Sequence, residues 1–401
     1  MQSSDKENLV QRLLWAFYVP SILIAVAYSV LTPVLPLYAS DLTSAFIVIG
    51  VILAAESFGR VIGDVPTSWV MRRFGIKQTM MIGLWVALVP MVMLFWVRSV
   101  PMIIGLLFVS GIGHAFYNIS RHAYIAVVIK TAIRGRAIGL LGGVFRIGGF
   151  VGPIIGGWVG AQFGLPSVFL AFGVLTIATM VFVWLFMRSL DADESALHGE
   201  KRPSMRKMLR ENANVLASAG SGQILAQLTR QGSKVLIPLY GANVLGLDVQ
   251  TIGIILAVGS ALDSTFFLVS GVIMDRFGRK WAIVPSFVIQ ATAIALMLLT
   301  TDALTLGLVS AMIGFGNALS AGTMMTVGAD LSSPDSRSEF LSVWRLIGDL
   351  GFVGGSLVVG VVAQALVIQM SVVAVMGAGF GAASLFAFFV PETLQRKRKH
   401  E

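Results

Sequence analysis

Long apolar stretches separated by short polar turns dominate the chain. About 20 apolar residues at a rise of 1.5 Å per residue cross the hydrocarbon core of a bilayer, so each stretch predicts one transmembrane helix. The stretches lie at 13–38, 44–71, 78–97, 100–129, 135–161, 165–187, 215–244, 249–274, 281–300, 303–329, 338–363 and 368–390. The predicted fold class is an all-α membrane protein with 12 transmembrane helices in two six-helix bundles.

The basic residues are concentrated on alternate turns. The turns that follow even-numbered spans, the polar segment 188–214 and the two ends of the chain together carry 22 lysines and arginines, whereas the turns after odd-numbered spans carry only Arg98. Because basic residues stay on the cytoplasmic side, we expect a multi-pass protein of the cell inner membrane with both termini in the cytoplasm. The expected domains are a bundle at 1–189, a cytoplasmic linker at 190–214 and a second bundle at 215–401.

Composition excludes several classes of function. Of the residues, 56% are hydrophobic and only 12% are charged, and the chain has no cysteine. The net charge of +9 could indicate nucleic acid, but anchoring to the cytoplasmic leaflet already accounts for it. The four histidines lack metal-ligand spacing, and neither a nucleophile–base pair nor a Walker-type loop is visible. We therefore expect no metal, no cofactor, no nucleic-acid partner and no enzymatic activity.

The two halves of the sequence repeat each other. Met71–Lys77 closes the second span, and the similar segment Met274–Lys280 closes the eighth. Phe145-Arg146 in the fifth span is matched by Trp344-Arg345 in the eleventh. The glycines in register are Gly149, Gly152 and Gly156 with Gly348, Gly351 and Gly355. Such repeats predict pseudo-symmetric halves with a substrate site between them near the midplane.

Two motifs resemble the major facilitator superfamily, and the resemblance covers essentially the whole chain. Gly271-Val-Ile-Met-Asp275-Arg-Phe-Gly278-Arg-Lys280 is similar to the family's signature loop between the second and third helices of a half. The first-half copy departs from it, with Ser68 in place of the opening glycine and Arg72 in place of the aspartate. The resemblance implies a monomeric secondary transporter that works by alternating access.

The second motif is Gly148-Gly-Phe-Val-Gly152-Pro153-Ile-Ile-Gly156-Gly157 in the fifth span. It resembles the Gly-Pro motif that the family associates with antiporters and exporters. Small residues four apart let helices approach closely, and Pro153 bends the helix where a rocking interface would need it; ordinary glycine-mediated packing is the alternative interpretation. The family's fourth-helix arginine is not matched, because Leu107 occupies its position and Arg121 lies further along.

Ionisable residues inside the predicted spans are the strongest functional signal. They are Glu56, Arg60, Asp64, Arg121, Arg146, Arg230, Lys234, Asp263, Arg345 and Asp349. Each costs about 2.5–3.5 kcal/mol at a helix centre, so each must pair or face water. Glu56, Arg60 and Asp64 form an acidic–basic–acidic ladder with i, i+4, i+8 spacing, and Arg345 and Asp349 form an i, i+4 pair.

The resemblance places spans 2 and 11, and spans 5 and 8, opposite each other across the two halves. It therefore implies an inter-half pair between Arg146 and Asp263. The candidates for proton coupling are Asp64, Glu56, Asp263 and Asp349. The candidates for inter-half gating are Arg60, Arg146, Arg345, Asp275, Gly152 and Pro153. The alternative is that these pairs only hold the interface together.

Polar faces on the fourth and seventh spans predict where a substrate binds. Gln223, Gln227, Arg230 and Lys234 share one helical face, as do His114, Asn118 and Arg121. The resemblance makes spans 1, 4, 7 and 10 line the cavity. The substrate-binding candidates are Arg230, Lys234, Gln227, Arg121, His114, Asn118, Tyr28 and Asn317. Pairing of Arg230 with another helix, and hydrogen-bonded packing of His114, are the structural alternatives.

These features predict a proton-coupled antiporter that exports small amphipathic molecules. The first span contains no acid, although many multidrug members of the family have one there. This disfavours cationic drugs as substrates and favours organic anions or lipid-like molecules. The partners expected are a small-molecule substrate, protons and the bilayer. The alternatives are an importer or uniporter of organic anions, a transporter of lipid-like substrates, and a membrane sensor that does not transport.

Overall fold

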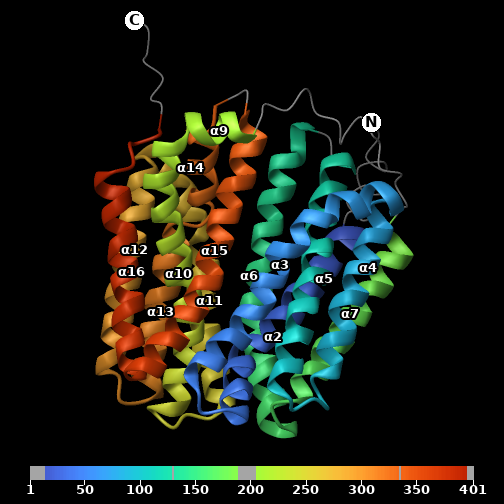
Figure 1. Ribbon diagram of the computed structural model, residues 1–401, viewed down its shortest axis with the longest axis vertical. Coiled ribbons are helices and arrows are strands. Elements are labelled where there is room, and N and C mark those ends of the chain that lie inside the picture. The colour runs from blue at the N-terminus through green and yellow to red at the C-terminus, as the bar shows by residue number, and fades with distance from the viewer. Residues whose placement is uncertain (1–13, 129–130, 188–204, 334–335, 395–401) are drawn as a thin grey trace, which may run out of the picture. The chain divides into compact units, whose positions relative to one another are not determined.

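The computed structural model describes residues 14–128, 131–187, 205–333 and 336–394. In these ranges the regular secondary structure is helical, without strands, as predicted (Figure 1). Most of the predicted linker 190–214 and the basic tail lie outside the described residues. Counting α13 and α14 as one span, the described helices account for the twelve predicted spans.

The first six spans are single continuous helices. They are α2 (Val19–Leu42), α3 (Phe46–Phe74), α4 (Ile76–Met93), α5 (Val100–Val128), α6 (Thr131–Phe163) and α7 (Ser167–Phe186), with a short π-helical turn η1 (Leu14–Tyr18) before α2. Their bounds follow the apolar stretches because the thickness of the hydrocarbon core sets the length of each helix.

The later spans follow the short helix α9 (Met205–Glu211). They are α10 (Ala213–Asn243), α11 (Val249–Arg276), α12 (Arg279–Leu296) with the 3-10 turn η2 (Met297–Leu299), α13 (Ala303–Leu319), α14 (Thr323–Leu331), α15 (Arg337–Ala365) and α16 (Ile368–Phe388). Eleven stretches of the described chain are long and apolar enough to cross a membrane. The seventh predicted span, α10, is not one of them because its polar stripe makes it less apolar.

The contacts divide the chain into two compact units. The first comprises Met1–Glu200 with Pro238–Ala257, and the second comprises Lys201–Ile237 with Val258–Glu401. The core of the second unit contains the rings of Phe287, Phe340, Trp344 and Phe386, and Met208 of α9 is buried in the same cluster. The bundle limits 1–189 and 215–401 stay a prediction.

In the first unit, the glycine motif of α6 packs directly against α2. A Cβ atom placed on Gly148 would lie 2.6 Å from the Cβ of Ala25, and one on Gly152 would overlap Ser29. A Cβ on Gly156 would overlap the α2 backbone in the same way. Only glycine therefore permits this approach, which matches the role of small residues in membrane helix pairs.

The second unit repeats this contact between α15 and α10. A Cβ atom on Gly351 would lie 2.5 Å from the carbonyl oxygen of Ile224, and one on Gly355 would lie 2.8 Å from that of Leu228. The sequence register between the two glycine series thus corresponds to the same helix contact in each unit.

The two copies of the signature loop also end in the same way. Lys77 Nζ donates to the carbonyl oxygens of Trp184 at 2.9 Å and Met187 at 2.7 Å, at the end of α7. Lys280 Nζ donates to the carbonyl oxygen of Ala387 at 2.8 Å, near the end of α16. The last carbonyls of a helix lack intrahelical partners and carry partial negative charge, so a lysine stabilises each end.

One predicted helix is broken. The stretch 303–329 was expected to be continuous, but α13 ends at Leu319 and α14 begins at Thr323. Gly322 adopts φ of +78°, which ends the helical path, and the Oγ of Ser270 donates to the freed carbonyl of Ala321 at 3.0 Å. The predicted span is supported, but its helix is interrupted, because a glycine in the left-handed region supported by a neighbouring hydroxyl makes the break stable inside protein.

Replacing Gly152 with valine should destabilise the first unit. Overpacking costs roughly 1–3 kcal/mol, which corresponds to a fall of about 2–12 °C in unfolding temperature for a unit of this size. Tryptophan-fluorescence melting of the purified protein measures this. The matched control is Gly143→Val on the same helix, where an added Cβ meets nothing within 4 Å. Equal losses in the two variants would contradict the α2–α6 contact.

Candidate functional site

A carboxylate and an imidazole meet inside the first unit. The Nδ1 of His114 on α5 lies 3.0 Å from the Oε1 of Glu56 on α3, and the two side chains are 14% and 19% exposed. The ring of Tyr28 on α2 stacks on the imidazole, with centroids 3.8 Å apart and an interplanar angle of 19°. Two residues predicted to bind substrate and one predicted to carry a proton are thus brought together.

Glycines explain how these side chains reach each other. A Cβ atom on Gly111 of α5 would overlap the backbone carbonyl of Glu56, and one on Gly59 of α3 would overlap the carbonyl of Phe108. The helices α3 and α5 therefore approach to backbone contact. His114 follows Gly111 by about one turn of α5. At this close helix separation its imidazole reaches the carboxylate of Glu56 directly.

The ladder expected along α3 is only partly correct. Arg60 donates from Nη2 to the Oγ of Ser57 at 2.9 Å and forms no ion pair among the described residues. The partner of Glu56 is His114, and Asp64 lies half-buried two turns further along α3. An i, i+4 ion pair contributes only about 0.3–0.5 kcal/mol, so a buried partner on the neighbouring helix prevails.

A second polar cluster surrounds the break in the tenth span. Arg230 on α10 donates from Nη2 to the Oγ of Ser320 at 2.7 Å, and its guanidinium lies over the ring of Phe287 at 5.3 Å. The hydroxyl of Ser286 is 2.7 Å from that of Ser320, and Gln290 Nε2 donates to Ser286 at 3.0 Å. The sequence predicted Arg230 but missed Ser320 and Phe287, which contact it, and Ser286 and Gln290, which extend the cluster.

The remaining candidates of the second unit form smaller pairs. Asn317 Nδ2 donates to Asp263 Oδ1 at 3.1 Å, and the amide oxygen of Gln227 accepts from Arg230 Nη1 at 3.5 Å. Lys234, further along α10, is exposed. A proton-coupling candidate and a substrate-binding candidate therefore share a hydrogen bond at Asp263.

The predicted i, i+4 pair of Arg345, a gating candidate, and Asp349, a proton-coupling candidate, forms in the structure. Arg345 Nε lies 3.7 Å from Asp349 Oδ2, as the i, i+4 spacing predicts. Arg146 donates from Nη1 to the carbonyl of Gly142 at 3.3 Å. Its expected pairing with Asp263 across the halves stays a prediction. The structure buries Gly152 and Pro153 and leaves Asn118 half-buried, while Arg121 is buried against aromatic rings.

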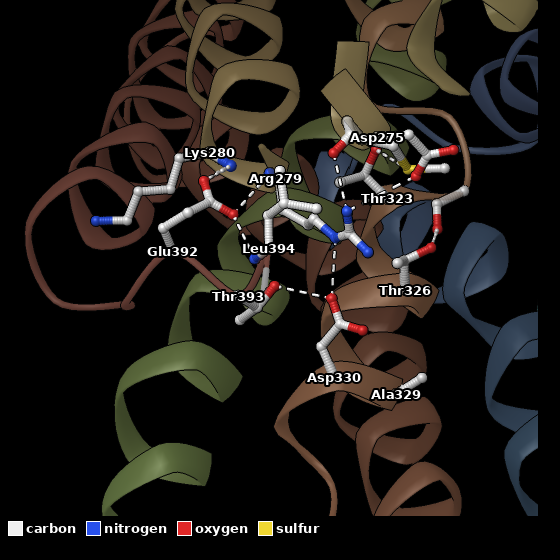
Figure 2. Close-up of polar contacts among 12 residues, drawn as sticks. Asp275, Arg279, Lys280, Thr323, Thr326, Ala329, Asp330, Glu392, Thr393 and Leu394 are labelled. Atoms are coloured by element: carbon white, nitrogen blue, oxygen red, sulfur yellow. Dashed lines mark hydrogen bonds and ion pairs between the residues drawn. The ribbon is translucent and has the colours of Figure 1, made fainter. Parts of the chain in front are cut away.

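The signature loop of the second unit forms a cluster of charges around Arg279, shown in Figure 2. The Nε of Arg279 donates to Asp330 Oδ2 at 2.9 Å, and its Nη1 lies 3.7 Å from Asp275. The hydroxyl of Thr393 donates to the same oxygen of Asp330 at 2.9 Å. The loop, the end of α14 and the segment after α16 are thereby joined.

Glu392 caps the start of α12 in this cluster. Its carboxylate accepts the backbone N–H groups of Arg279 at 2.9 Å, Lys280 at 3.1 Å and Leu394 at 2.9 Å (Figure 2). Partial burial opposes ionisation of Glu392, but the backbone donors outweigh it and hold the pKa of the carboxyl below its ordinary value. Sequence reasoning noted Pro391-Glu-Thr393 without assigning it this role.

No group of three or more histidine or acidic side chains within the described ranges could hold a metal ion.

Comparison with known proteins finds the same family in both halves of the chain. The family model described as the Major Facilitator Superfamily matches residues 19–221 and again residues 219–401. A protein of Lactococcus lactis subsp. lactis (strain IL1403), named as a multi-drug resistance efflux pump PmrA homolog, is 24% identical over 377 residues, covering 88% of this chain and 87% of that protein.

Two further similarities bear on the fold and on the branch of the family. The class C tetracycline resistance protein of Escherichia coli is 26% identical over 194 residues, which cover 45% of this chain and 46% of that protein. The crystal structure of a D-xylose–proton symporter superposes with a TM-score of 0.76 at 14% identity, covering 96% of this chain and 98% of that one. At this identity the superposition shows the fold alone.

Replacing Glu392 with glutamine should lower the unfolding temperature at neutral pH, because an amide accepts the three N–H bonds more weakly. The depressed pKa means that the stabilisation is complete above the ordinary glutamate value of about 4.3 and is lost as pH falls through the lower folded value. The difference from wild type should hold between about pH 6 and pH 8 and shrink below about pH 4. Melting curves across this range test it, and a difference that persists undiminished in acid would contradict it.

Proposed function

This chain belongs to the Major Facilitator Superfamily, and we propose that it is a proton-coupled antiporter that exports small amphipathic molecules by alternating access. Membership makes it a multi-pass membrane transporter of small molecules and not an enzyme. The observation that carries the proposal is the hydrogen bond between Glu56 and His114 inside the first unit.

The pair is suited to take up and release one proton. With Glu56 ionised and His114 neutral, the pair has a net charge of −1, and one added proton brings it to zero. Inside a membrane bundle the two charge states differ strongly in the environment they prefer, because a low dielectric penalises unbalanced charge. A movement of α3 against α5 that lengthens the 3.0 Å contact would therefore change how tightly the proton is held.

Two observations support export, and a third supports the orientation in the membrane. Two relatives are named as an efflux pump homolog and a tetracycline resistance protein. The glycine motif of the fifth span lies in the tight α2–α6 contact, where a rocking movement would be transmitted. The placement of basic residues supports cytoplasmic termini. We take the monomer as the working form, with substrate contacts from the Arg230 cluster in the second unit.

A second candidate function is proton-coupled uptake of organic anions. The observation that favours it is Arg121, a buried cation without a carboxylate partner among the described residues. The same Glu56–His114 pair would carry the proton, and only the direction of coupling would differ.

Transport by purified protein in liposomes that contain a pH-sensitive dye tests both candidates. Tetracycline, ethidium and benzoate are added outside. Antiport predicts that the interior becomes alkaline as substrate enters, whereas cotransport predicts that it becomes acidic. Glu56→Gln should reduce substrate-dependent proton movement at least tenfold, about 1.4 kcal/mol, because the pair can no longer ionise. Exchange of labelled for unlabelled substrate should survive, since exchange requires no net protonation change.

Two controls locate the proton. Asp64→Asn tests the rival carboxylate of α3, and Glu339→Gln removes an acid from the first turn of α15. If proton movement is lost in Asp64→Asn and retained in Glu56→Gln, the Glu56–His114 pair does not carry the transported proton.

Replacing Arg230 with alanine separates a transporter from a membrane sensor. The variant should assemble and melt near the wild-type temperature but lose most substrate flux, because Ser320 at the helix break loses its guanidinium partner. Flux is measured in the same liposomes. Unchanged flux would remove the Arg230 cluster from the transport path.

A further inference from the structure

Arg121 is a buried cation whose hydrogen-bonding capacity is only partly used. It lies on α5 about two turns beyond His114, and only 2% of the residue is exposed. The Nε and Nη1 atoms have no hydrogen-bond partner. No ion pair to Arg121 occurs within 14–128, 131–187, 205–333 and 336–394.

The groups around the guanidinium are aromatic. Its Cζ atom lies 4.4 Å from the ring centroid of Phe145 on α6 and 5.5 Å from that of Tyr117, one turn earlier on α5. Cation–π contacts of this kind contribute up to about 2 kcal/mol when desolvated. They balance part of the charge, but ring faces do not accept the in-plane N–H donors, which need oxygen acceptors.

Two other arginines each donate at least one side-chain hydrogen bond to a hydroxyl oxygen. Arg230, also within the bundle, donates to the hydroxyl of Ser320. Arg98 is exposed and donates to the hydroxyl of Tyr38 at 3.1 Å. The carboxylate of Glu56, which lies in the same unit, is hydrogen-bonded to His114. The charge of Arg121 is thus left for a ligand to neutralise.

We propose that Arg121 binds the carboxylate of an aromatic, amphipathic substrate. The planar guanidinium matches a carboxylate with two parallel hydrogen bonds. The hydroxyl of Tyr117 is buried beside the guanidinium, makes no well-aligned hydrogen bond and supplies one more donor. One guanidinium balances a single negative charge, which favours a carboxylate over a dianionic phosphate. The rings of Tyr117 and Phe145 contact the aromatic body of the substrate.

The side chain of Phe145 controls access of the carboxylate to Arg121. Its side chain covers the guanidinium yet is itself 36% exposed, so a rotation of this one ring uncovers Arg121. The inference rests on the proposed transport function for access to the site, but it does not depend on the direction of transport or on the identity of the proton carrier.

Thermal unfolding of the purified full-length protein in detergent tests the site without any pH gradient. Tryptophan emission is the readout, since the chain has eight tryptophans and no cysteine for thiol-reactive dyes. The probes are benzoate, 1-naphthoate, their neutral amides and inorganic phosphate. We expect the two carboxylates to raise the unfolding temperature of the wild type, and the amides and phosphate to leave it unchanged.

Variants assign the effect to Arg121. Arg121→Gln should weaken the apparent affinity for 1-naphthoate at least tenfold, because charge-assisted hydrogen bonds are lost. Arg121→Lys keeps the charge but not the planar donors and should show an intermediate loss. Arg98→Gln removes the same charge from an exposed position and should bind like the wild type. Arg121→Lys also keeps the test valid if the glutamine variant fails to fold.

Several outcomes would overturn the proposal. They are equal shifts with acids and amides, a shift with phosphate alone, no shift with either carboxylate, and equal binding by wild type and both Arg121 variants. The result is independent of the proton-coupling test. A failure of Glu56→Gln to change proton movement would leave carboxylate binding in detergent intact, whereas a failed carboxylate site would leave the proton signal intact.

Discussion

The structure depends on backbone contact between helices at glycine. Lipid is as apolar as a leucine side chain, so the hydrophobic effect does not hold membrane helices together, and close packing has to do so. Gly59 and Gly111 bring α3 and α5 together, and Gly148 and Gly152 do the same for α6 and α2. The hydrogen bond between a glutamate and a histidine on different helices is a consequence of the first contact. Any side chain larger than hydrogen at Gly111 would therefore act on the proposed proton site without touching it.

The same constraint decides where the helices can be interrupted. Backbone groups freed inside a bilayer need partners, so a break is stable only inside protein. At the end of α13 the carbonyl of Ala321 receives the hydroxyl of Ser270, and Ser320 receives the guanidinium of Arg230. A cation at the end of a helix is also favoured by the partial negative charge of its last carbonyls. The half-buried Arg230 thus finds a hydroxyl acceptor at the break, which accounts for a charge on the least apolar of the spans.

The spans could be predicted to within a few residues because the bilayer fixes their length, and even α10 follows the prediction despite its polar face. The repeats that carry the lysine caps and the glycine contacts were also visible in the sequence, although the caps and contacts themselves were not. Two features were not. The partner of Glu56 lies 58 residues away on another helix, whereas spacing along one helix shows only its own i+4 neighbours. The break at Gly322 escaped because Ser320 and Ala321 fit a continuous helix equally well, and only the supporting hydroxyl of Ser270 decides the matter.

The relation between the two sites of the first unit bears on the direction of transport. A carboxylate bound at Arg121 cancels a positive charge about two turns from His114, which makes it easier to add a proton to the Glu56–His114 pair. By linkage, a proton on the pair then favours the carboxylate to the same extent. Electrostatics alone therefore gives tighter carboxylate binding in acid, which suits cotransport. An antiporter must instead bind the proton and the carboxylate in different conformations. In the protonated conformation Phe145 would then cover Arg121 and exclude the carboxylate. Tighter binding of 1-naphthoate at about pH 8 than at about pH 6 would support antiport, because protonation would then exclude the carboxylate. Tighter binding at about pH 6 would support uptake by cotransport.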